Sequence, residues 1–278
     1  MRVRTRRMLA GAATVGACAA LVCAVQAQAP KAPALGPGAT AEIQHIHLRA
    51  PDPEAAVQWY ASHMVCAAWA RKDSCRTNTS TQFNFLKGTP KGGSQDTGID
   101  HLGFSFTDVA AKLRELEAAG VKVLAGPREV PGLFTIAFVE DPWGTRIELV
   151  EDRDALGFHH VHLRSAEPAG ALAWYERMFG GERTKFRGRL EGLRYGQVWI
   201  LASPVPRTAG AILPTEGRSA DHIGWGVADI AATTAYLAAQ GVERSEPRAY
   251  TEPYTKQKLR FSLLTGPDGV RVEVVQLE

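Results

Sequence analysis

The sequence predicts an α+β fold of two tandem domains, and an internal repeat is the observation on which this prediction rests. Five short motifs occur twice in the same order, at an offset that grows from 115 to 125 residues only between the motifs. Such a repeat indicates a duplicated domain with loop insertions. We therefore expect domains at 43–151 and 158–278, joined by a linker at 152–157. The paired motifs are His45–Arg49 with His160–Arg164, Trp59-Tyr60 with Trp174-Tyr175, Asp100–Gly103 with Asp221–Gly224, Gly120-Val121 with Gly241-Val242, and Pro142–Val150 with Pro267–Val275.

Strand and helix patterns alternate within each copy. Ile43 to Arg49 alternates apolar and polar residues, as half-buried strands do. Pro53 suits the first turn of a helix that extends to about Met64. Each domain is therefore expected to hold two units, each made of a strand, a helix and further strands. The other expected elements are strands near 66–71, 82–86, 99–107, 121–124, 134–139 and 146–151 and a helix at 109–119, with counterparts in the second copy that include helices at 171–178 and 231–240.

The N-terminal 27 residues are typical of a signal peptide. Four arginines precede an uncharged apolar run from Met8 to Val25, and Ala27 suits the last position before a signal-peptidase cut. Arg6-Arg7 also resembles a twin-arginine signal. A retained membrane anchor and a lipoprotein signal ending at Cys18 are the alternatives. We expect an exported protein, periplasmic or secreted by the general or the twin-arginine route, with a leader at 28–42.

Removal of the signal changes the charge balance. Lys plus Arg falls from 32 to 28 against 29 Asp plus Glu, so the net charge goes from +3 to −1. No basic stripe remains, which excludes nucleic acid as an expected partner. After signal removal no membrane partner is expected either. Cys66 and Cys75 remain as the cysteines of the mature chain, and they either pair in an oxidising compartment or stay separate thiols.

The histidines concentrate on predicted strands. Residues two apart on a strand share a face, so His45 and His47 point one way while Ile46 and Leu48 point the other. The same holds for His160 and His162 in the second copy, and His101 and His222 begin the corresponding strands of the second units. Glu148 and Glu273 face the same side from the last strands. Two imidazoles and one carboxylate with open positions form a set suited to a divalent metal ion.

Several residues keep more than one interpretation. His47 and His162 are candidate acid–base groups, second neighbours of the metal, or pocket walls. Arg49 and Arg164 are candidates to bind an anionic substrate group, although an arginine at a strand end is often a paired surface charge. A polar cavity without any metal is the simpler alternative for the whole set. His63 and His159 are expected to be incidental.

These residues resemble the vicinal-oxygen-chelate superfamily of glyoxalases, bleomycin-resistance proteins and extradiol dioxygenases. The motifs that carry the resemblance are His45-x-x-Leu48-Arg49-x-x-Asp52, Trp59-Tyr60, Asp100-His101-x-Gly103 and Asp141-Pro142-x-Gly144-x-x-x-Glu148. The resemblance implies that each domain is a cup-shaped sheet of paired βαβββ units. It also implies one divalent metal ion per domain (Fe, Mn, Zn or Ni), a small-molecule substrate, and a homodimer as one compatible assembly. Carried over, the ligands are His45, His101 and Glu148 in the first domain and His160, His222 and Glu273 in the second.

The chain departs from both well-known enzyme patterns of this superfamily. Extradiol dioxygenases carry a Tyr four residues before the Pro of the last turn, where this chain has Phe138 and Leu263, and Gly266 replaces the Asp before Pro267. Glyoxalase-type lyases add a carboxylate from the last strand of the first unit. That strand reads Gln82-Phe-Asn84-Phe in one copy and Gln197-Val-Trp199-Ile in the other.

The function expected first is therefore a metal-dependent, glyoxalase-like lyase or isomerase acting on a small oxygenated molecule. His47, His162, Glu148 and Glu273 are its candidate catalytic residues, because each could move a proton beside the metal. A non-haem Fe(II) dioxygenase of the extradiol type is the first alternative. A binding or sequestering protein of the bleomycin-resistance type is the second.

Overall fold

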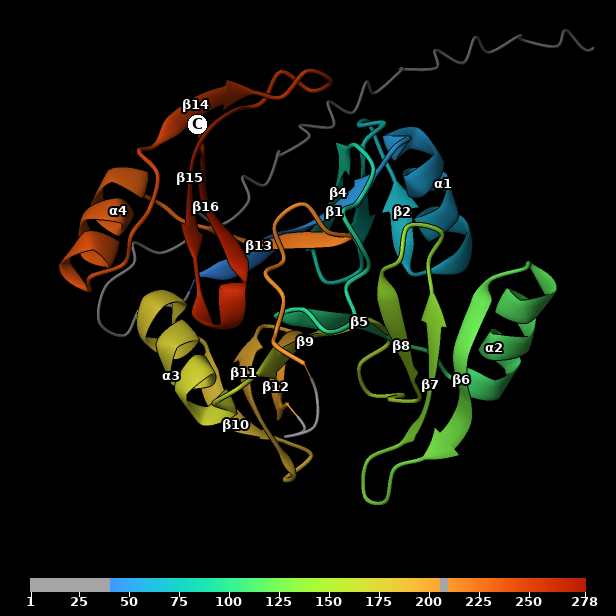
Figure 1. Cartoon of the computed structure of the whole chain (residues 1–278). Coiled ribbons are helices and arrows are strands. Elements are labelled where there is room, and N and C mark those ends of the chain that lie inside the picture. The colour runs from blue at the N-terminus through green and yellow to red at the C-terminus, as the bar shows by residue number, and fades with distance from the viewer. Residues whose placement is uncertain (1–40, 206–209) are drawn as a thin grey trace, which may run out of the picture. The chain divides into compact units, whose positions relative to one another are not determined.

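The computed structural model describes residues 41–205 and 210–278 (Figure 1). The predicted signal peptide and all but the last two residues of the predicted leader lie outside this range. Within it the chain forms four helices, sixteen strands and one short 3-10 helix at Pro267–Gly269. The predicted α+β class is confirmed.

Each helix begins where the sequence supplies a capping residue or a proline. Asp52 accepts hydrogen bonds from the backbone N–H groups of Glu54 and Ala55, and Pro53 occupies the first turn. Asp108 and Asp229 cap two further helices in the same way. No helix among the described residues is long and apolar enough to cross a membrane. The helices are α1 (Pro53–His63), α2 (Val109–Ala118), α3 (Pro168–Phe179) and α4 (Ile230–Ala239).

The strands form two mixed sheets of eight strands each. Their orders are β14-β15-β16-β13-β1-β4-β3-β2 and β10-β11-β12-β9-β5-β8-β7-β6. The first sheet holds β1 (Glu42–Ala50), β2 (Cys66–Ala68), β3 (Ser74–Thr77), β4 (Gln82–Lys87), β13 (Ala220–Gly226), β14 (Arg248–Thr251), β15 (Lys258–Thr265) and β16 (Arg271–Leu277). The second holds β5 (Ile99–Ser105), β6 (Lys122–Glu129), β7 (Thr135–Glu140), β8 (Arg146–Val150), β9 (Gly157–Ser165), β10 (Glu182–Phe186), β11 (Leu190–Tyr195) and β12 (Val198–Pro204).

The two units of one repeat do not share a sheet, which corrects the arrangement expected from the sequence. The first unit (42–87) pairs with the fourth (220–277), and the second (99–150) pairs with the third (157–204). The joining contacts are antiparallel pairs between first strands, β1 with β13 and β5 with β9. All four units present the same pattern of apolar and polar faces. Either pairing therefore buries the same surfaces, and the pattern alone does not distinguish them.

The face of each sheet opposite the histidines is apolar and buried. Ile46 and Leu48 of β1 are at most 1% exposed, and so are Val161 of β9 and Ile223 of β13. Each helix packs on strands of its own unit, such as α1 on β2 and α4 on β15 (Figure 1). Burial of the apolar face fixes the orientation of each strand. The residues that alternate with the buried ones therefore point to the opposite face, where the polar groups lie.

A disulfide joins Cys66 of β2 to Cys75 of β3, which resolves the alternative left open by the sequence. It closes the hairpin that follows α1. Trp69, Arg71 and Asp73 lie between the two cysteines, so the bond restrains the segment that carries them.

Candidate metal centres

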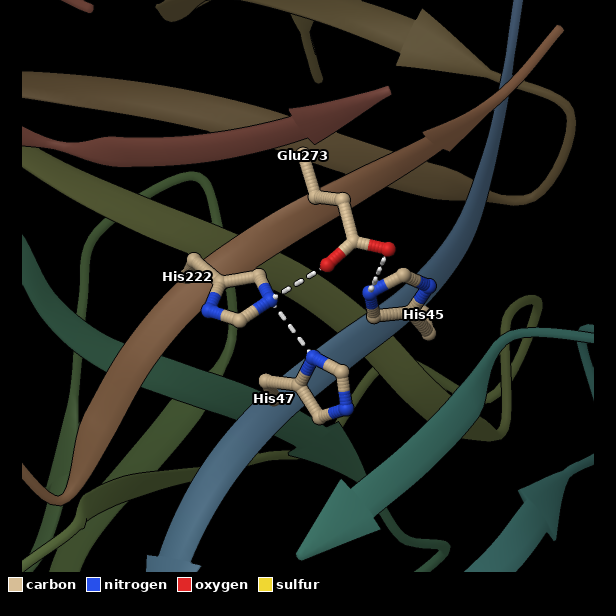
Figure 2. Close-up of side chains that lie close together, drawn as sticks. All are labelled: His45, His47, His222 and Glu273. Carbon is tan, nitrogen blue, oxygen red and sulfur yellow. Dashed lines mark hydrogen bonds and ion pairs between the residues drawn. The ribbon is translucent and has the colours of Figure 1, made fainter. Parts of the chain in front are cut away.

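Two clusters of histidine and glutamate lie on the polar faces of the sheets. The first holds His45 and His47 from β1, His222 from β13 and Glu273 from β16 (Figure 2). The second holds their counterparts His160 and His162 from β9, His101 from β5 and Glu148 from β8. In each cluster, one potential ligand atom per residue lies within 4.8 Å of all the others.

All six predicted ligands belong to these clusters, but the predicted grouping is wrong. His45 lies with His222 and Glu273, not with His101 and Glu148. The physical reason is the pairing of β1 with β13, which brings the first repeat's opening strand beside the second repeat's closing unit. The predicted catalytic residues His47 and His162 also lie inside the clusters, each as a fourth potential ligand.

One histidine and the glutamate of each cluster lie in one row of residues across the sheet, and the other two histidines pair with each other. In the first sheet, Gln82 pairs with His45, His45 with Gly224, Gly224 with Glu273, and Glu273 with Leu263. Directly paired residues on neighbouring strands point to the same face. The row in the second sheet is Trp199, His160, Gly103, Glu148 and Phe138.

A glycine at the centre of each row lets the histidine reach the glutamate. A Cβ placed on Gly224 would lie 2.0 Å from Cε1 of His45, and one on Gly103 would lie 2.1 Å from the ring of His160. The imidazole therefore occupies the space that any side chain would need. This close approach explains the glycine in both copies of the Asp-His-x-Gly motif.

An aspartate fixes the ring of His222 from behind. Asp221 Oδ1 lies 2.7 Å from His222 Nδ1, while Nε2 of the same ring lies 3.2 Å from Glu273 Oε2. Burial opposes a charge on His222, but Asp221 and Glu273 outweigh burial and raise its pKa. Burial would likewise raise the pKa of Asp221, yet its bonds to His222 and Arg49 hold it well below the usual range. A carboxylate behind a ligating imidazole orients the ring and raises its basicity.

Arg49 and Arg164 support these aspartates and do not line the cavity described below. Arg49 donates to Asp221 Oδ2 at 2.9 Å, and Arg164 lies 2.7 Å from Asp96 and 3.8 Å from Asp100. Asp100 in turn contacts His101 Nδ1 at 2.7 Å. The structure therefore gives the two arginines a positioning role, and their predicted substrate contact receives no support. They sit at strand ends, where a paired charge is common.

Burial favours the neutral form of four other imidazoles, whereas for His101 the contacts with Asp100 and Glu148 outweigh burial and raise the pKa. Burial lowers the pKa of His45 and of His160 to about 4, and burial also lowers the pKa of His47 and His162 well below 6.5. The other ring nitrogens of the clusters converge on the glutamates: His101 Nε2 and His160 Nε2 lie 3.3 and 3.1 Å from Glu148 Oε2, and His45 Nε2 lies 3.9 Å from Glu273 Oε1. His162 Nδ1 is buried and has no hydrogen-bond partner among the described residues, and buried polar atoms are seldom left unpaired. Imidazole nitrogens that converge with a carboxylate fit a divalent metal ion in both centres.

The partners of His45 and His160 also come from their own strands. Gln44 Oε1 contacts Nδ1 of His45, and His159 Nδ1 lies 2.8 Å from Nδ1 of His160. His159 is fully buried and reaches Asp152 at 3.3 Å. The expectation that His159 is incidental is therefore wrong, because a buried polar chain from Asp152 ends on a predicted ligand. Its position directly before His160 was the signal that could have revealed this.

A cavity of about 460 Å³ opens over the first centre. His45, His47, His222 and Glu273 line it together with apolar side chains of β4, β15 and β16, among them Leu86, Leu263 and Val275. The sequence did not reveal the rest of its wall. That wall comes from the 66–77 hairpin (Trp69, Arg71, Asp73 and Arg76) and from 250–257 (Tyr250, Glu252, Thr255 and Gln257). Neither segment belongs to a repeated motif.

Comparison with known proteins places the chain in a family. The model of the glyoxalase/bleomycin resistance protein/dioxygenase superfamily matches residues 42–149 and again 157–274. This chain belongs to that superfamily. A probable lactoylglutathione lyase of Arabidopsis thaliana is 36% identical over 96 residues, which are 34% of this chain and 27% of the relative.

Solved structures show the same superfamily fold. Glyoxalase I from Zea mays superposes with a TM-score of 0.62 at 16% identity, covering 85% of this chain and 92% of that one. A Bacillus subtilis protein described as a dioxygenase gives 0.58 at 18% identity, with 85% of each chain covered. At these identities the likeness concerns the fold, and the chemistry has to be argued from the residues.

The two centres of this chain differ in what surrounds the ligands. Gln82 and Asn84 lie beside His45 and His47 in the first sheet, whereas Trp199 and Leu201 take the same register positions in the second. Leu263 opposes Glu273, whereas Phe138 opposes Glu148 and its ring centroid lies 5.3 Å from that of His101. The second centre is therefore flanked by larger apolar groups than the first.

The central glycine provides a test of the geometry. Replacing Gly224 with Ala should weaken metal binding at the first centre by at least about tenfold, because the added methyl group displaces the His45 ring. Gly226→Ala is the matched control, since its Cβ would meet Gln44 Cβ at an ordinary 3.4 Å. Calorimetric titration with metal measures the affinity of both variants. Wild-type affinity in Gly224→Ala would contradict the placement of His45.

Proposed function

We propose that this chain is a divalent-metal-dependent, glyoxalase-like lyase or isomerase that acts on a small oxygenated molecule at the first centre. The observation that carries the proposal is that three imidazoles and one carboxylate converge on the wall of a 460 Å³ cavity. A cavity of this size suits a small-molecule ligand. The relative named as a lactoylglutathione lyase supports this reaction class.

His45, His47, His222 and Glu273 would hold the ion. Nitrogen and carboxylate oxygen donors suit Zn, Fe, Mn or Ni. When bound, the ion would polarise adjacent oxygens of the substrate and so acidify a hydrogen on the carbon beside a carbonyl. His47 serves as a ligand, because its Nδ1 lies 2.5 Å from the His222 Nε2 that faces Glu273.

Glu273 is the group that moves the proton. Glu273 lines the cavity, and the residue is 8% exposed. Burial would raise its pKa, but His222 and His45 lower it below its usual range, so the group is ionised at neutral pH. Apolar side chains form much of the surrounding wall, and exclusion of water strengthens the electrostatic contacts of the site.

The alternatives fit this cavity less well. Ring-cleaving extradiol chemistry lacks its tyrosine, because the corresponding residue Leu263 is an apolar part of the cavity wall. A purely sequestering protein would not need the carboxylate–imidazole pairs that orient the ligands. We propose that the second centre also binds a metal ion, and that turnover takes place at the first, over which the 460 Å³ cavity opens.

Exchange of the substrate's carbon-bound hydrogen separates these functions. Glu273→Gln should lower the rate of exchange from the hemithioacetal of methylglyoxal and glutathione in deuterated water by about a hundredfold or more, the usual size of a lost general base. Three imidazoles remain, so metal stays bound at the first centre. Nuclear magnetic resonance measures the exchange rate, and elemental analysis measures the metal content of the variant.

Glu148→Gln is the matched control, because it changes the second centre and should leave the exchange rate close to that of the wild type. No exchange by the metal-loaded wild type with this substrate or other hydroxycarbonyl compounds would contradict the proposed reaction class. Ligand binding unaffected by chelator would then favour the sequestering alternative.

We also propose that the protein is exported. The supporting observation within the described residues is the Cys66–Cys75 disulfide, because such bonds persist in oxidising compartments. Changing both Arg6 and Arg7 to Lys should stop export if the twin-arginine route is used. Immunoblotting of cell fractions measures the amount of mature protein outside the cytoplasm. An amount equal to that of the wild type would exclude the twin-arginine route.

A further inference from the structure

Arg76 stands in the same row of residues as the first metal centre. It pairs with Gln82 across β3 and β4, and Gln82 pairs with His45 across β4 and β1. Directly paired residues share a face of the sheet, and both Arg76 and His45 line the cavity. Two strand spacings separate their backbones, which is about 10 Å.

The charge of Arg76 has no acidic partner. Two other arginines line the cavity, and both are neutralised: Arg71 pairs with Asp73 and Glu252, and Arg271 pairs with Asp221 and Glu216. Arg76 makes no ion pair within 41–205 and 210–278. Its guanidinium carbon lies 3.6 Å from the ring centroid of Trp69, which also lines the cavity.

Stacking on Trp69 fixes the guanidinium without using its hydrogen-bond donors. The planar fork of an arginine binds a carboxylate through two parallel hydrogen bonds. Trp69 is itself held by a hydrogen bond from Nε1 to Ser74 Oγ at 3.2 Å. The neighbouring Cys75 is tied to Cys66 by the disulfide, so the hairpin that presents this pair is restrained at its base.

The rest of the cavity is suited to an apolar body. Phe85 and Leu86 lie on the β4 side, and Leu259, Phe261 and Leu263 lie on β15. The acidic residues on its wall are already engaged, since Asp73 and Glu252 bind Arg71 and Glu273 faces the histidines. The cavity thus offers metal-binding groups at one place, an unpaired cation at another and apolar surface besides.

We propose that Arg76 and Trp69 form an anion subsite that selects substrates with a carboxylate attached to an apolar or aromatic body. This inference deepens the proposed function by naming a substrate class for the same cavity. The substrate's vicinal oxygens would face His45 and Glu273, while its carboxylate would meet Arg76. Arg76 is then a specificity-determining residue.

The second sheet supplies a matched control. Arg194 pairs with Trp199, which pairs with His160, so it holds the register position of Arg76 in the other row. Its Nε donates to the carbonyl oxygen of Gly196 at 2.9 Å, and it is absent from the cavity wall. Both arginines are exposed, and substitution of either should leave the fold intact.

Calorimetric titration with cinnamate and its neutral amide, cinnamamide, tests the proposal. Wild-type protein and Arg194→Ala should bind cinnamate about tenfold more tightly than cinnamamide, the effect of one charge-assisted contact. Arg76→Ala should bind the two equally. The wild-type preference should persist after chelator treatment, because the subsite does not involve the metal.

A cinnamate preference that survives in Arg76→Ala would overturn the proposal. So would a wild-type preference that disappears with chelator, since the carboxylate would then be bound by the metal. The binding comparison between cinnamate and cinnamamide is made on chelator-treated protein, so it does not depend on the lyase or isomerase reaction. The subsite can therefore be confirmed when the proposed reaction is not found, and the reaction can be confirmed when the subsite is not.

Discussion

The antiparallel pairing of β1 with β13 is the interaction on which the first centre depends, and β5 with β9 has the same place in the second. This pairing sets His45 opposite Gly224 and, through the parallel pairing of β13 with β16, in line with Glu273. A shift of β1 by one residue would turn His45 and His47 to the apolar face. Burial of Ile46, Leu48 and Ile223 on that face prevents the shift. The hydrophobic core and the metal centre are therefore specified by the same register.

Burial of the polar side chains of the two clusters is energetically unfavourable. Charged side chains placed behind the imidazoles offset this unfavourable free energy. Behind His222 lies Asp221, which is fully buried, and beyond it lie Arg49 and Arg271. His101, Asp100 and Arg146 repeat this order in the second centre. A buried carboxylate is destabilising unless it is paired and hydrogen-bonded. The strand-end arginines thus stabilise the aspartates that orient the imidazoles.

The sequence predicts which residues belong to the two clusters but not how they are grouped. Period-two alternation places His45, His222 and Glu273 on a polar face, and the repeat supplies their counterparts, so all six predicted metal ligands fall within the two clusters. Those counterparts are His160, His101 and Glu148. The pairing of the units cannot be predicted, because all four units present equivalent faces and edges. The walls of the cavity were missed for a different reason. Trp69, Arg76 and Tyr250 lie in segments without a repeated motif, and only the fold brings them to the ligands. The sequence left two roles open for Arg49, because its partner Asp221 is 172 residues away.

Metal titration of two double variants tests the cross-repeat centres most directly. His45→Ala with Glu273→Ala removes two ligands from the first centre only, so the chain should keep one site of wild-type affinity. His45→Ala with Glu148→Ala removes one ligand from each centre, so no site of wild-type affinity should remain. If the centres were instead built within each repeat, the two results would be exchanged, and that outcome would contradict the assembly of each metal centre from both repeats.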